Sequence, residues 1–342
     1  MYDGIHRPSF SSPTRRRVIR CALASVLATT ILAGCGATER ADDRPGAPRA
    51  KGFPVTINNC GTRTTYDKPP ARVVTIHQHP AELMLALGLK KAMVGTSFPD
   101  SAVLPEHRRD FGRIPELAKK EPSFETVVDA DPDFVYGGYG SAFAEKEGRS
   151  RKVFAEAGIH TYLNREYCGK GRVAMADAYE EIRTIGRIFG IQGRADELVT
   201  RLEERVDKTT EAVEGGRPVP VFVYDSGDKA AFTAGGKSLG TEIIRLAGGR
   251  NVFGDLDEVF GDVSWEQVAE RKPEVIAIYD YRGSGSVEQK KKFLLSHPAL
   301  ADVPAVKNQR FTVLPLTSTL VGVRPPYAVE DLARRLHPER FR

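Results

Sequence analysis

An internal repeat constrains the fold of this chain more than any other feature. The stretch SFETVVDADPDFVYG begins at Ser123, and SWEQVAERKPEVIAIY begins at Ser264. Aligned without a gap, the two stretches share serine, an aromatic residue, glutamate, valine and proline. Their glutamates, Glu125 and Glu266, lie 141 positions apart, the difference between 125 and 266. Solenoid repeats have periods of about 20 to 50 residues, so this much longer period predicts two similar domains.

The composition is that of a globular protein with room for two domains. The chain has 342 residues, of which 41% are hydrophobic and 28% charged. Its net charge of +5 suggests an anionic partner, but residues 1–35 hold five arginines and one acidic residue. The remaining residues carry only about +1 by the same count. Nucleic-acid binding therefore has no electrostatic support once this leader is removed, and we expect none.

The leader is typical of an exported protein. Basic RRRVIR precedes the apolar run CALASVLATTILAG, which is too short to span a bilayer comfortably and fits a secretory signal. LAGC, residues 32–35, resembles the bacterial lipobox, in which the cysteine is lipidated and becomes the first mature residue. We predict a signal peptide over residues 1–35, a lipid on Cys35, and an extracytoplasmic protein attached to the cell membrane. The alternative is an ordinary cleaved signal peptide with a chance cysteine.

Two cysteines, Cys60 and Cys168, remain in the mature chain. Because exported proteins meet an oxidising compartment, an even pair is a candidate disulfide. Both cysteines lie in turn-rich stretches, NNCGTRT and REYCGKG, which favours a bond between them. The alternative is two buried free thiols.

Helices and strands are predicted to alternate on both sides of a helical middle. Residues 36–54 are polar and rich in proline and glycine, which predicts a flexible tether. Examples of the alternation are a strand at 72–76, a helix from Pro80, and a helix capped by Ser123 that ends at Pro132. Such alternation predicts an α/β fold with mostly parallel sheets covered by helices.

A long helix over residues 192–215 separates two α/β segments, 55–191 and 216–342. It runs about 20 residues without proline or glycine, some 30 Å at 1.5 Å per residue. That length could join two globular bodies; the alternative is a surface helix of one lobe.

Two short motifs resemble enzyme signatures. AGGKSLG lacks the first glycine of a phosphate-binding loop, because that position is Ala231. GKSLG matches a nucleophile motif and would make Ser238 the nucleophile of a secreted serine hydrolase, with His297 or His337 as base. The other interpretation is that Ser238 caps the helix that follows. No oxyanion segment accompanies the motif, and we predict that the chain is not an enzyme.

Ligands of open α/β sheets bind beyond the carboxyl ends of the strands. The loops expected there are rich in aromatic residues and arginines, which suits a bulky, partly apolar ligand with anionic or acceptor groups. His77 and His79, on either side of Gln78, could supply metal ligands or one axial ligand to haem, or simply line the site. Because no third ligand is visible nearby, we predict no metal site made by the protein alone. The other candidate residues are Tyr136, Tyr139, Arg165, Tyr167, Phe232, Tyr281, Arg282, Arg324 and Tyr327.

From Val55 to Arg342 the chain resembles the solute-binding lipoproteins of bacterial ABC importers for iron–siderophore, haem and cobalamin. The resemblance rests on PARVVTIHQHPAELMLALGL, PSFETVVDADPDFVYG, the long central helix, FTAGGKSLGTEIIRLAGGRNVFG and DVSWEQVAERKPEVI. It implies two Rossmann-like lobes joined by a single long helix, with a ligand cleft between them. It also implies cleft contacts near Tyr139, Phe260 and Arg324.

The same resemblance implies a partner and a ligand. Glu125 and Glu266 occupy the positions that meet arginines of a dimeric permease, and two like acids suit a symmetric transporter. The alternative is that they merely favour their helix N-termini. The expected ligand is a ferric siderophore or related metal chelate, with haem or cobalamin as the alternative, bound by a monomer without a resident cofactor. HQHP departs from the small polar residues expected at its position, which adds weight to haem.

Overall fold

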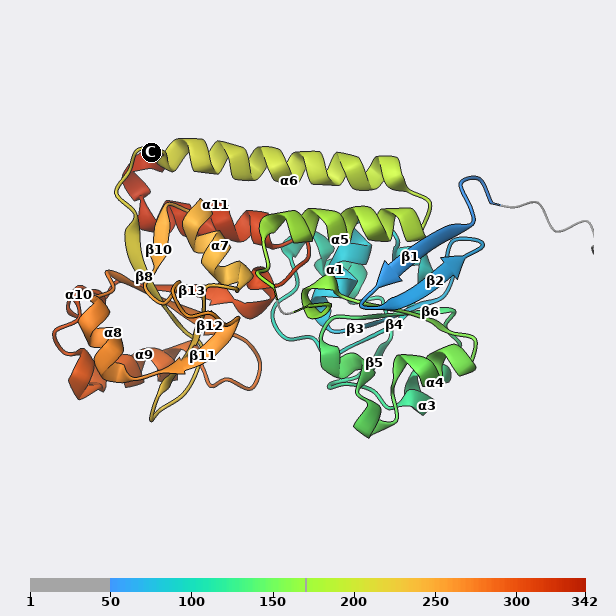
Figure 1. Cartoon of the computed structure of the whole chain (residues 1–342), viewed down its shortest axis with the longest axis horizontal. Coiled ribbons are helices and arrows are strands. Elements are labelled where there is room, and N and C mark those ends of the chain that lie inside the picture. The colour runs from blue at the N-terminus through green and yellow to red at the C-terminus, as the bar shows by residue number, and fades with distance from the viewer. Residues whose placement is uncertain (1–49, 170) are drawn as a thin grey trace, which may run out of the picture. The chain divides into compact units, whose positions relative to one another are not determined.

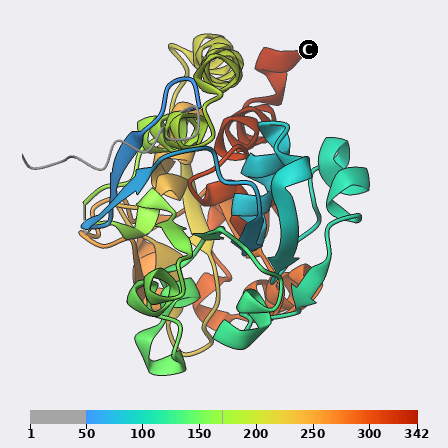
Figure 2. The same ribbon diagram turned by 90° about the vertical axis from the view of Figure 1, so that its right-hand side faces the viewer.

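The computed structural model describes residues 50–169 and 171–342 (Figures 1 and 2). The predicted signal peptide with Cys35, and the tether up to residue 49, lie outside these residues. Within the described ranges, none of the helices combines the length and apolarity that a bilayer crossing requires. Phe53, which we placed in the tether, is only 9% exposed and packs in the core. The packed part of the chain thus starts earlier than predicted.

The N-terminal lobe is built on five parallel strands in the order β5-β4-β3-β6-β7. Every residue of β3 and β6 is buried, as expected for parallel strands covered on both faces. The strands are β3 (Val73–Ile76), β4 (Met93–Ser97), β5 (Glu116–Ala118), β6 (Phe134–Gly137) and β7 (His160–Leu163). The helices are α1 (Gln78–Ala86), α2 (Arg108–Phe111), α3 (Phe124–Val128), α4 (Arg151–Glu156) and α5 (Met175–Ile188).

The C-terminal lobe is built on four parallel strands in the order β10-β8-β12-β13. Its strands are β8 (Val219–Tyr224), β10 (Gly249–Asn251), β12 (Val275–Asp280) and β13 (Phe311–Pro315). Its helices are α7 (Leu239–Leu246), α8 (Trp265–Arg271), α9 (Val287–Ser296), α10 (Pro304–Lys307) and α11 (Pro325–Leu336). Together the two parallel sheets and their helices confirm the predicted α/β class.

Two antiparallel pairs, which the sequence did not lead us to predict, accompany the parallel sheets. One joins β1 (Val55–Asn59) to β2 (Thr62–Tyr66), and the other joins β9 (Ala231–Ala234) to β11 (Phe260–Val263). The turn between β1 and β2 carries Cys60, which is disulfide-bonded to Cys168 in the loop after β7. The predicted disulfide is therefore confirmed, and it ties the β1–β2 hairpin to the N-terminal lobe.

The sequence repeat forms the same unit in both lobes. It produces α3 and β6 in the first copy, and α8 and β12 in the second. Each repeat strand lies beside the first strand of its parallel sheet, β6 beside β3 and β12 beside β8. The oxygens of the capping serines, Ser123 and Ser264, each accept a backbone N–H at 3.2 Å. Helix α3 ends at Val128, four residues before Pro132, and Asp131 in the following turn has a positive φ of 50°.

The long helix α6 (Gln192–Val213) follows the expected range. It packs along α5 of the N-terminal lobe and α11 of the C-terminal lobe, which run beneath it in Figure 1. Its buried residues recur at helical spacing, among them Leu198, Leu202 and Val206. The helix therefore contacts both lobes, and two α/β lobes joined by a long helix are confirmed.

Candidate functional site

In each sheet, two of the predicted ligand loops follow the strands on either side of the topological switch point, where the strand order changes direction. In the N-terminal lobe this point lies between β3 and β6, and in the C-terminal lobe between β8 and β12. The residues that follow these strands are His77 and Gly138 in the first lobe, and Asp225 and Tyr281 in the second. Such a switch point is where open α/β sheets bind their ligands.

His77 leaves β3 in a strained backbone conformation. Its φ of 81° and ψ of 159° fall in a region that is normally reserved for glycine and costs about 1–3 kcal/mol. The turn lets α1 begin at Gln78, two residues before the predicted start at Pro80, so His79 lies in the first helical turn. Strain of this kind persists where the surroundings fix the residue, and it clusters at functional sites.

The His77 ring uses both of its nitrogens within the protein. The backbone N–H of Tyr139 donates to Nδ1 at 3.2 Å, so Nε2 carries the hydrogen and donates to Glu121 at 3.2 Å. This hydrogen bond, with further help from Ser141 and Arg149, lowers the pKa of Glu121 to about 2. His77 also packs edge-to-face on Tyr139, with ring centroids 4.3 Å apart. It is thus a positioned residue with no free nitrogen.

His79 differs, because both of its ring nitrogens are buried without a hydrogen-bond partner among the described residues. The side chain lies against Gly138, where an added Cβ would come within 2.4 Å of the ring. The backbone of Gly138 opposes part of the pKa shift of this ring, while the Gly138 N–H donates to the Ile76 carbonyl oxygen at 2.9 Å. Burial, together with the nearby His77, lowers the pKa of His79 to about 3. The residue is a neutral imidazole, and one of its ring nitrogens carries a lone pair.

The described residues contain no group of three or more histidine, cysteine, aspartate or glutamate side chains able to hold a metal ion.

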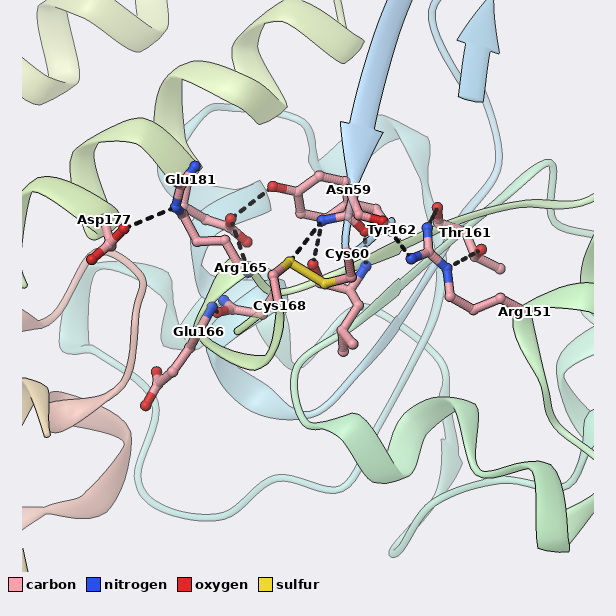
Figure 3. Close-up of a disulfide and its surroundings, with 12 residues drawn as sticks. Asn59, Cys60, Arg151, Thr161, Tyr162, Arg165, Glu166, Cys168, Asp177 and Glu181 are labelled. Carbon is pink, nitrogen blue, oxygen red and sulfur yellow. Dashed lines mark hydrogen bonds and ion pairs between the residues drawn. A yellow bond between two sulfur atoms is a disulfide. The ribbon is translucent and has the colours of Figure 1, made fainter. Parts of the chain in front are cut away.

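Tyr139 joins this cluster, whereas two other predicted residues do not. The Tyr139 hydroxyl donates to Asp100 at 3.1 Å, and burial raises the pKa of Asp100. The hydroxyl of Tyr136 instead donates to Glu181 in the buried core. Arg165 pairs with Asp177 at 3.2 Å beside the disulfide (Figure 3).

Gln78 and Arg324, both expected to contact ligand, bind a shared protein partner. Gln78 donates to Glu82 at 3.1 Å, and two nitrogens of the Arg324 guanidinium donate to the two oxygens of the same carboxylate. The Glu82 side chain is fully buried and that of Arg324 is 6% exposed. This carboxylate already neutralises the arginine that we expected to face an anionic ligand.

The C-terminal switch point has different chemistry. The Tyr281 hydroxyl donates to Asp225 at 2.7 Å, and the Lys290 ammonium lies 5.1 Å from the centre of the Tyr281 ring. Phe232 on β9 and Phe260 on β11 stack on each other, with ring centroids 5.6 Å apart. The backbone N–H of Arg282 donates to the backbone carbonyl oxygen of Asp100, in the other lobe, at 2.9 Å. The Arg282 side chain is exposed.

Sequence reasoning missed four acidic residues of the site: Glu82, Asp100, Glu121 and Asp225. Asp100 and Asp225 follow β4 and β8, so a stricter use of the carboxyl-end rule would have found them. Glu82 and Glu121 carry no such signal, because Arg324 and His77, which bind them, lie 242 and 44 residues away in the sequence.

Glu125 and Glu266 are exposed in the first turns of α3 and α8. Hydrogen bonds from the backbone and the capping serine lower the pKa of each. In Figure 1 both helices lie away from α6. Both side chains are thus ionised and free to meet a partner.

Ser238 caps α7, since its oxygen accepts the Thr241 N–H at 3.1 Å. Its hydroxyl donates to the Gly235 oxygen at 2.9 Å. Neither proposed base reaches it: the His337 ring contacts the Gly248 oxygen, and His297 packs on Trp265. The geometry favours the cap over the nucleophile.

Comparison with known proteins places the chain among relatives that bind and transport. The uncharacterized ABC transporter substrate-binding lipoprotein YvrC of Bacillus subtilis is 24% identical over 324 residues, covering 93% of this chain and 97% of that protein. A cobalamin-binding protein of Halobacterium salinarum is 27% identical over 278 residues, covering 80% and 69%.

Two solved structures share the fold. A periplasmic binding protein from Veillonella parvula has a TM-score of 0.75 and 27% identity, covering 83% of this chain and 97% of its own. An ABC-type Fe3+-hydroxamate transport protein from Saccharomonospora viridis has a TM-score of 0.69 and 29% identity, covering 84% and 99%. The family model described as periplasmic binding protein matches residues 73–316. The chain therefore belongs to the periplasmic binding protein family.

Proposed function

We propose that this chain is the non-catalytic substrate-binding protein of an ABC importer, and that it captures a ferric siderophore or related metal chelate. The observation that carries the ligand class is the neutral, buried and unpartnered imidazole of His79. An unsatisfied buried polar group is costly, so its retention calls for a role. A metal with one open coordination position would use that lone pair.

This reasoning narrows the chelates that suit the site. A hexadentate siderophore saturates its iron and leaves nothing for His79 to bind. Haem, cobalamin and ferric complexes of tetradentate siderophores each keep a position that imidazole can fill. The name of one relative supports part of this range, since it is a cobalamin-binding protein.

Equilibrium dialysis against a panel of chelates tests the ligand class. The panel contains haemin, aquocobalamin, a ferric tetradentate catecholate and a ferric hexadentate hydroxamate. We expect the tightest binding for a member with an open position, and His79→Ala to weaken it by at least about tenfold, or 1.4 kcal/mol. Preference for the hexadentate complex, unaffected by His79→Ala, would contradict the proposal.

Delivery would use Glu125 and Glu266 as the contacts with a dimeric permease. The support is their repeat relation, their exposure and their ionised state. Two like acids on equivalent helices match a partner that presents one basic site twice. Glu125→Ala with Glu266→Ala should abolish uptake and leave ligand affinity intact. Normal uptake by the double variant would contradict this role.

We further propose that the protein works as a monomer, attached outside the cytoplasm through a lipid on Cys35. The support is the lipobox-like sequence and a relative that is itself named a lipoprotein. Cys35→Ala should move the protein from the membrane fraction to the soluble extracytoplasmic fraction. Retention in the membrane fraction would show that another element holds it there.

A further inference from the structure

One segment of the C-terminal lobe is attached to the N-terminal lobe at three separate places. Residues 317–324, here named the crossing segment, connect β13 to α11 and are buried throughout. The segment is short and has no strand pairing of its own. Its position therefore depends on the groups that hold it.

The first two attachments are hydrogen bonds to loops of the N-terminal lobe. The hydroxyls of Thr317 and Ser101 lie 2.8 Å apart. At Val321, the N–H donates to Glu166 at 2.8 Å, and the carbonyl oxygen accepts from Asn164 at 2.9 Å. Both backbone groups of Val321 are thus satisfied by side chains of the other lobe.

The third attachment is the ion pair between Arg324 and Glu82. Besides the carboxylate, the guanidinium donates to the Ala102 oxygen at 2.6 Å. Glu82 in turn accepts the N–H of Leu104 at 3.0 Å. Both charges are buried, so removing either partner would leave the other as an unpaired charge in the protein interior, which is strongly destabilising. This attachment is the one whose loss should loosen the segment most.

The disulfide supports the middle attachment. Asn164 and Glu166 belong to the loop that ends at Cys168, and the bond to Cys60 ties this loop to the β1–β2 hairpin (Figure 3). Asn59, beside Cys60, also exchanges hydrogen bonds with the backbone of Leu163, at 2.7 and 2.8 Å. The loop is therefore held at Leu163 and at Cys168, on either side of the two residues that bind Val321.

The crossing segment also contacts the candidate ligand residue, at its backbone and Cβ. An added Cβ on Gly322 would stand 3.8 Å from the Cβ of His79 and 4.0 Å from its carbonyl oxygen. Glu82 is on the same helix as His79, one turn further along. The helix that carries the imidazole is thus the helix to which the segment is attached through Arg324.

We propose that the crossing segment must detach from the N-terminal lobe before any ligand can reach His79, and that the Arg324–Glu82 pair controls this step. Arg324 is then a residue that positions the lobes, in place of the ligand contact expected from the sequence. The proposal does not depend on which ligand binds, because it concerns the access of His79 in the free protein.

Chemical labelling of histidines tests the proposal without any ligand. Diethyl pyrocarbonate acylates accessible neutral imidazoles, and mass spectrometry reports each site separately. His160 is exposed and serves as the internal reference. We expect His79 to be labelled at least about tenfold faster in Glu82→Gln than in the unaltered protein, with His160 unchanged.

The matched control is Glu242→Gln, which alters the first-turn glutamate of α7, paired with the exposed Arg245. It should leave the labelling of His79 unchanged. Arg324→Lys keeps a cation opposite Glu82 and so protects the fold; it should give a smaller increase in the same direction. Fast labelling of His79 in the unaltered protein, or no increase in either folded variant, would overturn the proposal. The result is independent of chelate binding, so it fails or holds separately from the proposed function.

Discussion

The two lobes share one plan but present different chemistry at equivalent places. In both, the strand of the sequence repeat lies beside the first strand of its sheet, and a serine-capped helix with a first-turn glutamate precedes it. At the switch points, however, the N-terminal lobe offers a strained His77 and a neutral His79, while the C-terminal lobe offers Asp225 and Tyr281. The repeated helices of the two lobes are thus alike, whereas the loops at their switch points differ. This pattern fits a partner that is symmetric and a ligand that is not.

The comparison is sharpest at the glutamates of α1 and α7. Glu82 is buried with Arg324, whereas Glu242 pairs with Arg245, whose side chain is 61% exposed. We expect Glu82→Gln to lower the free energy of unfolding by about 3–5 kcal/mol, because it strands a buried cation. Glu242→Gln should cost less than about 1 kcal/mol. Urea denaturation of the two variants measures both, and equal losses would remove the distinction between the lobes.

The disulfide is a second difference, since among the described residues it joins parts of the N-terminal lobe alone. It links residues 108 positions apart, and replacing Cys60 and Cys168 by alanine should cost about 2–4 kcal/mol of unfolding free energy. Hydrogen exchange should rise in the β1–β2 hairpin and the loop at 164–168, and remain unchanged in α8 and β12. A uniform rise across both lobes would mean that the bond does not act locally.

The N-terminal lobe should also make the unfolding free energy depend on pH, through His79. The folded state lowers the pKa of His79 from 6.5 to about 3, so the unfolded chain binds the additional proton between these values. Stability from this group is present above pH 6.5 and is lost as the pH falls toward 3. Relative to His79→Leu, the unaltered protein should lose about 2 kcal/mol between about pH 7 and pH 5. Urea denaturation at both pH values checks this, and a difference between the two proteins that does not change with pH would contradict it.

The sequence predicted what depends on local pattern. The repeat indicated the shared helix–strand unit, alternation indicated the parallel sheets, and the two turn-rich cysteines indicated the disulfide. The carboxyl-end rule also brought His77 and Tyr139 to one place. Each of these features follows from neighbouring residues or from the geometry of a parallel sheet.

What the sequence could not predict depends on partners far away along the chain. Arg324 looked free for an anionic ligand, because its carboxylate, Glu82, lies 242 residues earlier. Tyr136 looked like a loop residue, but its place within β6 turns it inward onto Glu181. The start of α1 at Gln78 requires a backbone conformation of His77 that no propensity favours. Tertiary contacts decide all three.

The most direct test of the account is the absorption spectrum of the bound metal chelate in three proteins. We predict that the chelate with the highest affinity shows a ligand-field or Soret change on binding to the unaltered protein. The change should persist in His77→Gln, because both nitrogens of the His77 ring are already hydrogen-bonded within the protein. It should disappear in His79→Ala, which removes the ring whose nitrogens have no partner among the described residues. An identical spectral change in His79→Ala would show that this imidazole does not meet the metal, and would contradict the account.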